Sequence, residues 1–166
     1  MNRTIGTILV FVITACTTPF PSTSIPSSDD DGLCEWFNES LVVRTERTPA
    51  IIIVQDVTDK YSGVEFSFDN TAMMNDYIDA IEEYIAVNEH FIDEWNRLGD
   101  HPSAREYWEN ELKAVETYNE GYSLSLRGFR ERQGNLIQQG SEIYETGNIA
   151  SNKAEDLMID LRMRCR

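Results

Sequence analysis

The sequence predicts an all-α domain, an up-and-down bundle of three or four helices that follows a leader and a linker. Apolar residues recur at spacings of three and four over residues 74–98, and an apolar seven-residue repeat then runs over residues 108–161. Both patterns are typical of amphipathic helices that bury one face against neighbouring helices. By composition the chain divides into residues 1–15, 16–33 and 34–166.

The first fifteen residues have the composition of a secretory signal. Arg3 supplies a positive charge, and an uncharged, mostly apolar run of 12 residues extends from Thr4 to Ala15. A helix that crosses the hydrocarbon core of a bilayer needs roughly 20 residues. The run is therefore too short for an ordinary membrane anchor and fits the hydrophobic region of a signal peptide.

This leader ends in Ile13-Thr14-Ala15-Cys16, which resembles the lipobox of bacterial lipoprotein precursors. That family places an aliphatic residue three before the cysteine, a small or β-branched residue next and a small residue last; Leu is commoner where Ile13 stands. The resemblance covers only residues 1–16. It implies cleavage after Ala15, acylation (palmitate included) of Cys16, and a domain held outside the cytoplasm at a bacterial cell membrane or outer membrane. Two or three acyl chains give stable anchoring where one is marginal. A plain signal peptide with an incidental cysteine is the alternative.

The cysteine count agrees with this interpretation. The chain has three cysteines, Cys16, Cys34 and Cys165. If Cys16 carries lipid, the other two are free to form a disulfide in an oxidising compartment. Two free thiols in a reducing compartment are the alternative.

A linker follows the lipobox. Residues 17–31 hold three prolines, many hydroxyl side chains and a final run of three aspartates. Such a segment buries too little apolar surface to offset the entropy of ordering, so we expect a disordered or semi-extended spacer. It would hold the domain clear of a membrane surface.

The charge of the chain excludes one class of partner. The formal net charge is −15, and removal of Arg3 with the leader makes it −16. Nucleic-acid binding needs clustered Lys and Arg to neutralise phosphates, so no nucleic acid is expected. The acidity also disfavours a domain that lies flat on anionic lipid, and it permits cations or basic partners.

Residues 34–70 give the weakest structural signal. Pro49 interrupts the first apolar stretch, and the β-branched run Ile51–Val54 is too short to assign by periodicity. Val64, Phe66 and Phe68 alternate with polar residues, as in a strand. An isolated two-stranded hairpin is only marginally stable. We therefore favour a helix or irregular segment packed on the bundle, with a small β-hairpin as the alternative.

A long helix is predicted from Thr71 to Leu98. Asn70 or Thr71 can cap its start, and Gly99 can provide the left-handed residue that ends it. Its apolar face is wide and mostly free of charge. The face comprises Met74, Tyr77, Ile78, Ile81, Tyr84, Ile85, Phe91, Ile92, Trp95 and Leu98.

The next helix is predicted to begin at Ser103, which forms a capping-box pattern with Glu106. The seven-residue repeat then continues without a shift in phase to Leu161. A division at Gly134-Asn135 would give three long helices of similar length, and one at Gly147-Asn148 would give a very long helix and a short one. We favour the first division.

Motifs for catalysis or cofactor binding are absent from the sequence. Neither His90 nor His101 is preceded by a glutamate three residues earlier, as a di-iron bundle requires, and no zincin, nucleophile-elbow or phosphate-loop pattern occurs. We therefore expect no enzyme activity, no cofactor and no metal. The aromatic residues at helical spacing are interpreted as core.

Three arginines close the chain, at positions 162, 164 and 166. Helix C-termini favour basic residues, which is the simpler explanation of Arg162, Arg164 and Arg166. If Cys165 bonds to Cys34, however, the cluster lies beside the tether and faces the membrane. The functional hypothesis is a non-enzymatic interaction or scaffold module with an unknown envelope protein as partner. A helical bundle that binds a small ligand or cation is the alternative.

Overall fold

The computed structural model describes residues 32–166, and in this part of the chain every regular element is a helix. The elements are α1 (Leu33–Thr45), α2 (Thr48–Lys60), α3 (Thr71–Leu98), the short 3₁₀ helix η1 (Pro102–Ala104), α4 (Arg105–Glu131) and α5 (Gly134–Arg164). The predicted all-α class is confirmed.

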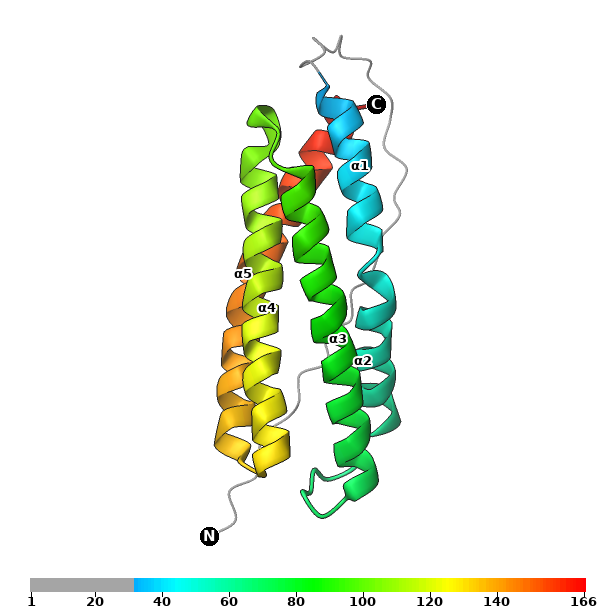
Figure 1. Ribbon diagram of the computed structural model, residues 1–166, viewed down its shortest axis with the longest axis vertical. Helices are drawn as coiled ribbons and strands as arrows, with labels where there is room; N and C mark the ends of the chain where they lie inside the picture. Colours follow the sequence, from blue (N-terminus) through cyan, green and yellow to red (C-terminus); the bar gives the residue numbers. More distant parts are fainter. Residues whose placement is uncertain (1–31) are drawn as a thin grey trace.

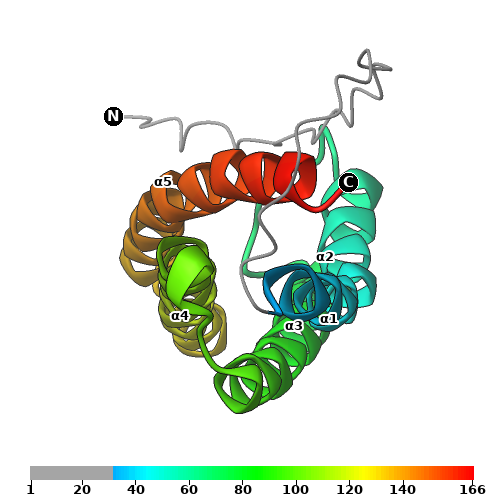
Figure 2. The same ribbon diagram turned by 90° about the horizontal axis from the view of Figure 1, so that it is seen from above.

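The helices form an up-and-down bundle with four legs. Helices α1 and α2 follow each other end to end and make one leg, and α3, α4 and α5 make the other three (Figure 1). Viewed along the bundle, the legs surround a common core (Figure 2). The C-terminus lies at the same end of the bundle as the start of α1 (Figure 1).

The break between α1 and α2 follows from Pro49, which occupies the first turn of α2. Proline has no backbone N–H and its ring crowds the preceding turn, so it is tolerated there and ends α1 before it. Glu46 and Arg47 at the joint nevertheless keep right-handed helical torsions. The leg is therefore a kinked helical pair.

The region that resembled a hairpin contains no strand. Ile51–Val54 lies inside α2, and Phe66 and Phe68 belong to the irregular connection between α2 and α3. The Phe66 ring lies 5.0 Å from that of Phe68 and 5.9 Å from that of Phe129 in α4. The strand-like alternation thus comes from Phe66 and Phe68, which cover the end of the bundle. In α2 the helical context overrides the β-propensity of Ile51, Ile52 and Ile53.

Helix α3 has the predicted bounds. The side chain of Asn70 accepts a hydrogen bond from the backbone N–H of Met73 at 3.1 Å, and Gly99 follows the last turn with φ +70°. Every residue of the predicted apolar face is buried or half-buried. Asn88, which the pattern did not single out, is also fully buried on this helix.

The predicted capping box at Ser103 is wrong. Ser103 lies within η1, and its backbone N–H donates to Nδ1 of His101 at 3.3 Å. Helix α4 begins only at Arg105, and no side chain caps it. Pro102 starts a 3₁₀ turn, so the imidazole of His101 caps the helical segment two residues before the position at which Ser103 was predicted to cap it.

Helices α4 and α5 divide as favoured, before Gly134. Arg132 ends α4 with φ 56°, and it is the one non-glycine residue with positive φ between residues 32 and 166. The N–H of Gln133 donates to the carbonyl of Gly128 at 2.8 Å, the pattern of a Schellman motif. Gly147, the other candidate break, lies inside α5.

Helices α4 and α5 approach each other through small residues. A Cβ atom on Gly140 would lie 2.4 Å from the carbonyl oxygen of Gly121 and 2.2 Å from Oγ of Ser125. One on Gly147 would lie 2.7 Å from the ring of Tyr118. Only glycine allows the two backbones to come this close.

Candidate functional site

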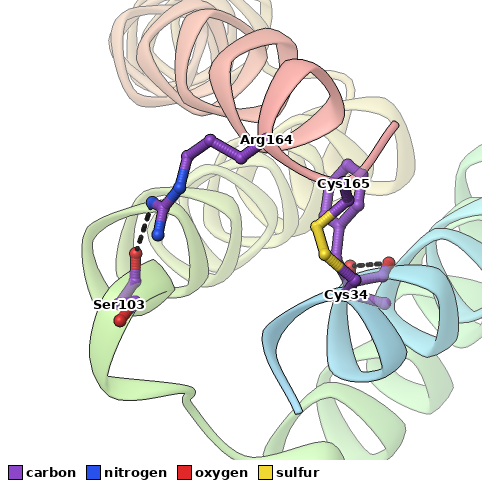
Figure 3. Close-up of a disulfide and its surroundings, with 6 residues drawn as sticks. Cys34, Ser103, Arg164 and Cys165 are labelled. Atoms are coloured by element: carbon purple, nitrogen blue, oxygen red, sulfur yellow. Dashed lines mark hydrogen bonds between the residues drawn. A yellow bond between two sulfur atoms is a disulfide. The ribbon is translucent and has the colours of Figure 1, made fainter. Parts of the chain in front are cut away.

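A disulfide closes the end of the bundle where the described chain begins. Cys34 in the first turn of α1 bonds to Cys165 at the end of α5, with 5.2 Å between their Cα atoms (Figure 3). This distance is ordinary for a disulfide. The predicted pairing is confirmed, and it links two positions 131 residues apart.

The three C-terminal arginines lie at this end. All three are exposed, and the guanidinium of Arg164 donates to the backbone carbonyl of Ser103 at 3.4 Å (Figure 3). This contact joins the end of α5 to η1. Arg164 and Arg166 flank Cys165 in the sequence, and the side chain of Arg164 extends toward Ser103 (Figure 3).

Cys16, the predicted leader and residues 17–31 of the predicted linker lie outside the described residues. The predicted boundary between linker and domain, after residue 33, is wrong: Leu33 begins α1 and is 2% exposed in the core, so the folded domain starts before Cys34. Within residues 32–166 no helix combines the length and the apolar composition that a membrane span requires.

A buried polar cluster lies at the joint between α1 and α2. Oε1 of Glu111 in α4 accepts hydrogen bonds from Nε of Arg44 at 3.3 Å and Nη1 of Arg47 at 3.2 Å. Nε of Arg47 also donates to Asn88 of α3 at 3.0 Å, and Asn88 donates to Asn119 of α4 at 2.8 Å. Arg44 also donates to Sδ of Met158 in α5 at 2.7 Å, so the cluster ties the joint to the other three legs.

This cluster is well shielded from water. Glu111 is 2% exposed and Arg47 6% exposed, and the Arg47 guanidinium lies 5.0 Å from the ring centre of Phe91. Burial alone would lower the pKa of Arg44, but Glu111 and its other neighbours raise it above its usual value. Oε2 of Glu111 accepts no hydrogen bond within residues 32–166. Arg44 and Arg47 thus share Oε1 of Glu111, and Arg44 also donates to Oε2 of Glu155 in α5 at 3.2 Å.

Tyrosines fill the middle of the bundle. The rings of Tyr84 and Tyr122 lie 4.6 Å apart, as do those of Tyr118 and Tyr144, and Tyr122 lies 5.1 Å from Tyr144. Burial raises the pKa of Tyr118, Tyr122 and Tyr144 above the usual value. Their contacts agree with the interpretation of the aromatic residues as core.

A groove between α2 and α3 is acidic. It has a volume of about 290 Å³ and an apolar floor of Ile53, Val57 and Ala80. Lys60 and Tyr61 both donate to Asp76 at 2.6 Å, and these hydrogen bonds lower the pKa of that carboxyl. The carboxylates that line the groove are Asp56, Asp76, Asp79 and Glu83.

A second groove, of about 280 Å³, lies where α3 begins and α4 ends. Its charged lining residues are Arg130 and Arg132, and no carboxylate from the described part of the chain lines it. The apolar side chains that line it are those of Phe68, Met74, Ile78 and Phe129. The two grooves thus have nearly equal volumes and opposite charge.

The histidines stand apart from these features. His90 is exposed, with Nε2 3.8 Å from a carboxylate oxygen of Glu46, and His101 caps η1. Across residues 32–166, no three histidine, cysteine or acidic side chains converge closely enough to hold a metal ion.

Sequence reasoning missed the buried cluster and both grooves. Glu111 and Asn88 occupy positions on the buried faces of α4 and α3, where the search for apolar periodicity counts only apolar residues. The sequence also contains a second seven-residue series, which lies one residue before the predicted one. It comprises Tyr107, Ala114, Gly121 and Gly128, and its small residues could have predicted a close contact between α4 and α5. The grooves join residues from separate helices and leave no local pattern.

Comparison with protein-family models, with curated proteins and with solved structures returned no match.

Proposed function

We propose that the chain is a membrane-tethered bacterial lipoprotein whose helical domain is a non-enzymatic interaction or scaffold module in the cell envelope. One observation carries this proposal. Cys34 and Cys165 bond to each other, so the lipobox cysteine is the one remaining thiol of the three in the chain. An acyl group on Cys16 accounts for it. The polypeptide enters the bundle at α1, at the end that carries the disulfide.

Intact mass of protein extracted from bacterial membranes tests the tether. Before and after reduction, the mass should match a chain that begins at Cys16 and carries acyl chains. Reduction should add two hydrogens, those of the disulfide. A Cys16→Ala variant should lose the acyl mass and leave the membrane fraction. A wild-type mass without acyl chains would overturn the lipoprotein assignment.

The arginines at the tethered end support a further part of this proposal, a membrane-facing basic cluster. Arg162, Arg164 and Arg166 would offset the repulsion between the acidic domain and anionic headgroups. Replacing all three by Gln in a form with a shortened linker should weaken association with anionic vesicles at low salt. Unchanged association would contradict a membrane-facing role for the three arginines.

The acidic groove between α2 and α3 favours a second candidate function, binding of a small cationic ligand. Four carboxylates line it, and Lys60 lies beside one of them. A thermal-shift screen over metals and small cations separates the two functions. A saturable rise of several degrees that Asp79→Asn abolishes supports a binder, whereas recovery of one envelope protein by crosslinking supports the interaction module.

A further inference from the structure

The groove where α3 begins and α4 ends lies at the end of the bundle far from the disulfide. Figure 1 shows α1 and the C-terminus at one end of the molecule and the end of α4 at the other. If Cys16 tethers the first end, the groove is at the end that projects from the membrane. This placement rests on the proposed function.

The size of the groove limits what it can hold. Sites for drug-sized ligands and cofactors run from about 300 to 1,000 Å³, and this groove is just below that range at about 280 Å³. Its floor is formed by Met74 and Phe129, each 7% exposed, and Phe68 and Ile78 are half-buried beside them. A single apolar side chain suits a space of this size and lining.

The charge of the groove selects an acidic partner. The chain as a whole carries a net charge of −15, yet among residues 32–166 the charged side chains that line this groove are two guanidiniums. Arg130 pairs with Glu82, and Arg132 lies 3.5 Å from Asp69, whose side chain is 93% exposed. Such exposed pairs contribute at most about 1 kcal/mol, so an incoming carboxylate can replace the present partners.

The backbone at Arg132 adds an independent observation. The position has φ 56° and ends α4, a place where glycine is usual because other residues pay about 1 kcal/mol or more for left-handed torsions. An arginine there lowers stability and places a guanidinium at the rim of the groove. Strain of this kind is frequent at functional sites.

We propose that this groove binds an acidic segment of a partner protein, with one aromatic or aliphatic side chain on the floor and flanking carboxylates on Arg130 and Arg132. Planar guanidiniums match carboxylates in two-point contacts, which fixes the orientation of the segment. The apolar side chain supplies the contact area. The site is the partner-binding surface of the interaction module.

Fluorescence anisotropy with the full chain in detergent micelles tests the proposal. The probe is a fluorescein-labelled pentapeptide with phenylalanine at its centre and glutamate at the other four positions. We expect saturable binding with a dissociation constant on the order of 1 mM or tighter. A peptide with alanine at the centre, and one with lysine in place of glutamate, should each bind at least about threefold more weakly.

Variants locate the binding. Arg130→Gln and Arg132→Gly should each weaken it about threefold, and the double variant about tenfold. Arg132→Gly suits the left-handed position, so it removes the guanidinium without harm to the fold. Arg127→Gln is the matched control, because this exposed arginine of α4 does not line the groove. It should bind as the wild type does.

Three results would overturn the proposal: no saturable binding, equal binding by the double variant, or equal binding of the lysine peptide. The mass measurement on Cys16 gives a separate answer. If Cys16 carries acyl chains but the peptide does not bind, the lipoprotein assignment stands and the binding role of the groove is rejected. If the peptide binds but Cys16 carries no acyl chain, the binding role stands and the lipoprotein assignment is rejected.

Discussion

Helices α4 and α5 meet through glycine, alanine, serine and tyrosine, whereas the leg made of α1 and α2 reaches its neighbours through bulky side chains, the cluster of Arg44 and Arg47 with Glu111, and a disulfide. The hairpin of α4 and α5 has a two-residue connection and backbones close enough that Gly140 and Gly121 nearly touch. The leg is kinked at its middle and is linked to α5 by Cys34 and to α4 by Glu111.

The difference shows two ways to hold a helix in a bundle. Contact between neighbours in the chain needs little loop-closure entropy, so the hairpin relies mainly on close packing, with a hydrogen bond from Tyr118 to Asn148 across it. The α1–α2 leg must reach partners far along the sequence, at separations of 64 for Arg47 with Glu111 and 131 for the disulfide. Its attachment should therefore be sensitive to the loss of single long-range links.

Alkali should have the largest effect, and it acts on buried tyrosines of α4 and α5, of which Tyr107 packs against α1 and α3. Burial raises the pKa of Tyr107, Tyr122 and Tyr144, so the unfolded chain releases these protons near pH 10 while the folded chain retains them. Below about pH 10 the three neutral tyrosines make their whole contribution to the free energy of unfolding. Above that pH the free energy of unfolding falls by about 4 kcal/mol per pH unit for the three together. Far-ultraviolet circular dichroism should show unfolding by about pH 12.

Tyr144→Phe is the control for that effect. It removes one of the three ionisable groups, so the decline with pH should be less steep. Helix content retained at pH 12, together with full tyrosinate absorbance near 295 nm, would contradict the assignment of these rings to the core.

Removal of Glu111 should have the next largest effect, on the leg. Glu111→Ala removes the carboxylate that pairs with the buried Arg47, while Arg44 keeps its second partner, Glu155. Loss of one partner of a buried pair costs about 3–5 kcal/mol. Urea unfolding measures the change. Glu116→Ala, at an exposed position of the same helix, should change stability by less than about 0.5 kcal/mol. Equal effects of the two variants would mean that the cluster contributes nothing.

The disulfide should rank third. In the loop-entropy model its closure of a long loop is worth up to about 5 kcal/mol, and typical losses are about 2–4 kcal/mol. The double variant Cys34→Ala with Cys165→Ala should therefore unfold at clearly lower urea. Cys16→Ala, which keeps the bond, should match the wild type. A double variant as stable as Cys16→Ala would show that the leg does not depend on its crosslink.

A methyl group in the hairpin contact should have the smallest effect. Gly140→Ala forces α4 and α5 apart, and overpacking of this kind costs about 1–3 kcal/mol. Gly134→Ala is the matched control, since a Cβ there lies 4.0 Å from its nearest neighbour, the ring of Phe68. Thermal unfolding should separate the two. If Gly140→Ala is no less stable than Gly134→Ala, the close contact is not needed.

The helices with periodic apolar residues could be predicted from the sequence. The apolar face of α3, its cap at Asn70 and its end at Gly99 are local patterns, and so is the repeat through α5. The cysteine count likewise predicted the disulfide once Cys16 was set aside. These features depend on spacing along the chain, and spacing is visible without a structure.

The remainder depends on contacts between distant residues. Nothing in the neighbourhood of Glu111 distinguishes it from the other glutamates of α4; it is buried because Arg44 and Arg47 meet it there. Ser103 had the sequence of a cap, but Pro102 and His101 formed a 3₁₀ turn first. The groove at Arg132 exists because Phe68, the start of α3 and the end of α4 meet at the same place.

Amide hydrogen exchange tests the contrast between leg and hairpin most directly. It would be measured by mass spectrometry on the wild type and on the double variant Cys34→Ala with Cys165→Ala. We predict that protection in the variant falls throughout α1 and α2 while α4 and α5 keep at least most of theirs, because the two regions open separately. Equal loss of protection in both regions would contradict this account and would show that the bundle opens only as a whole.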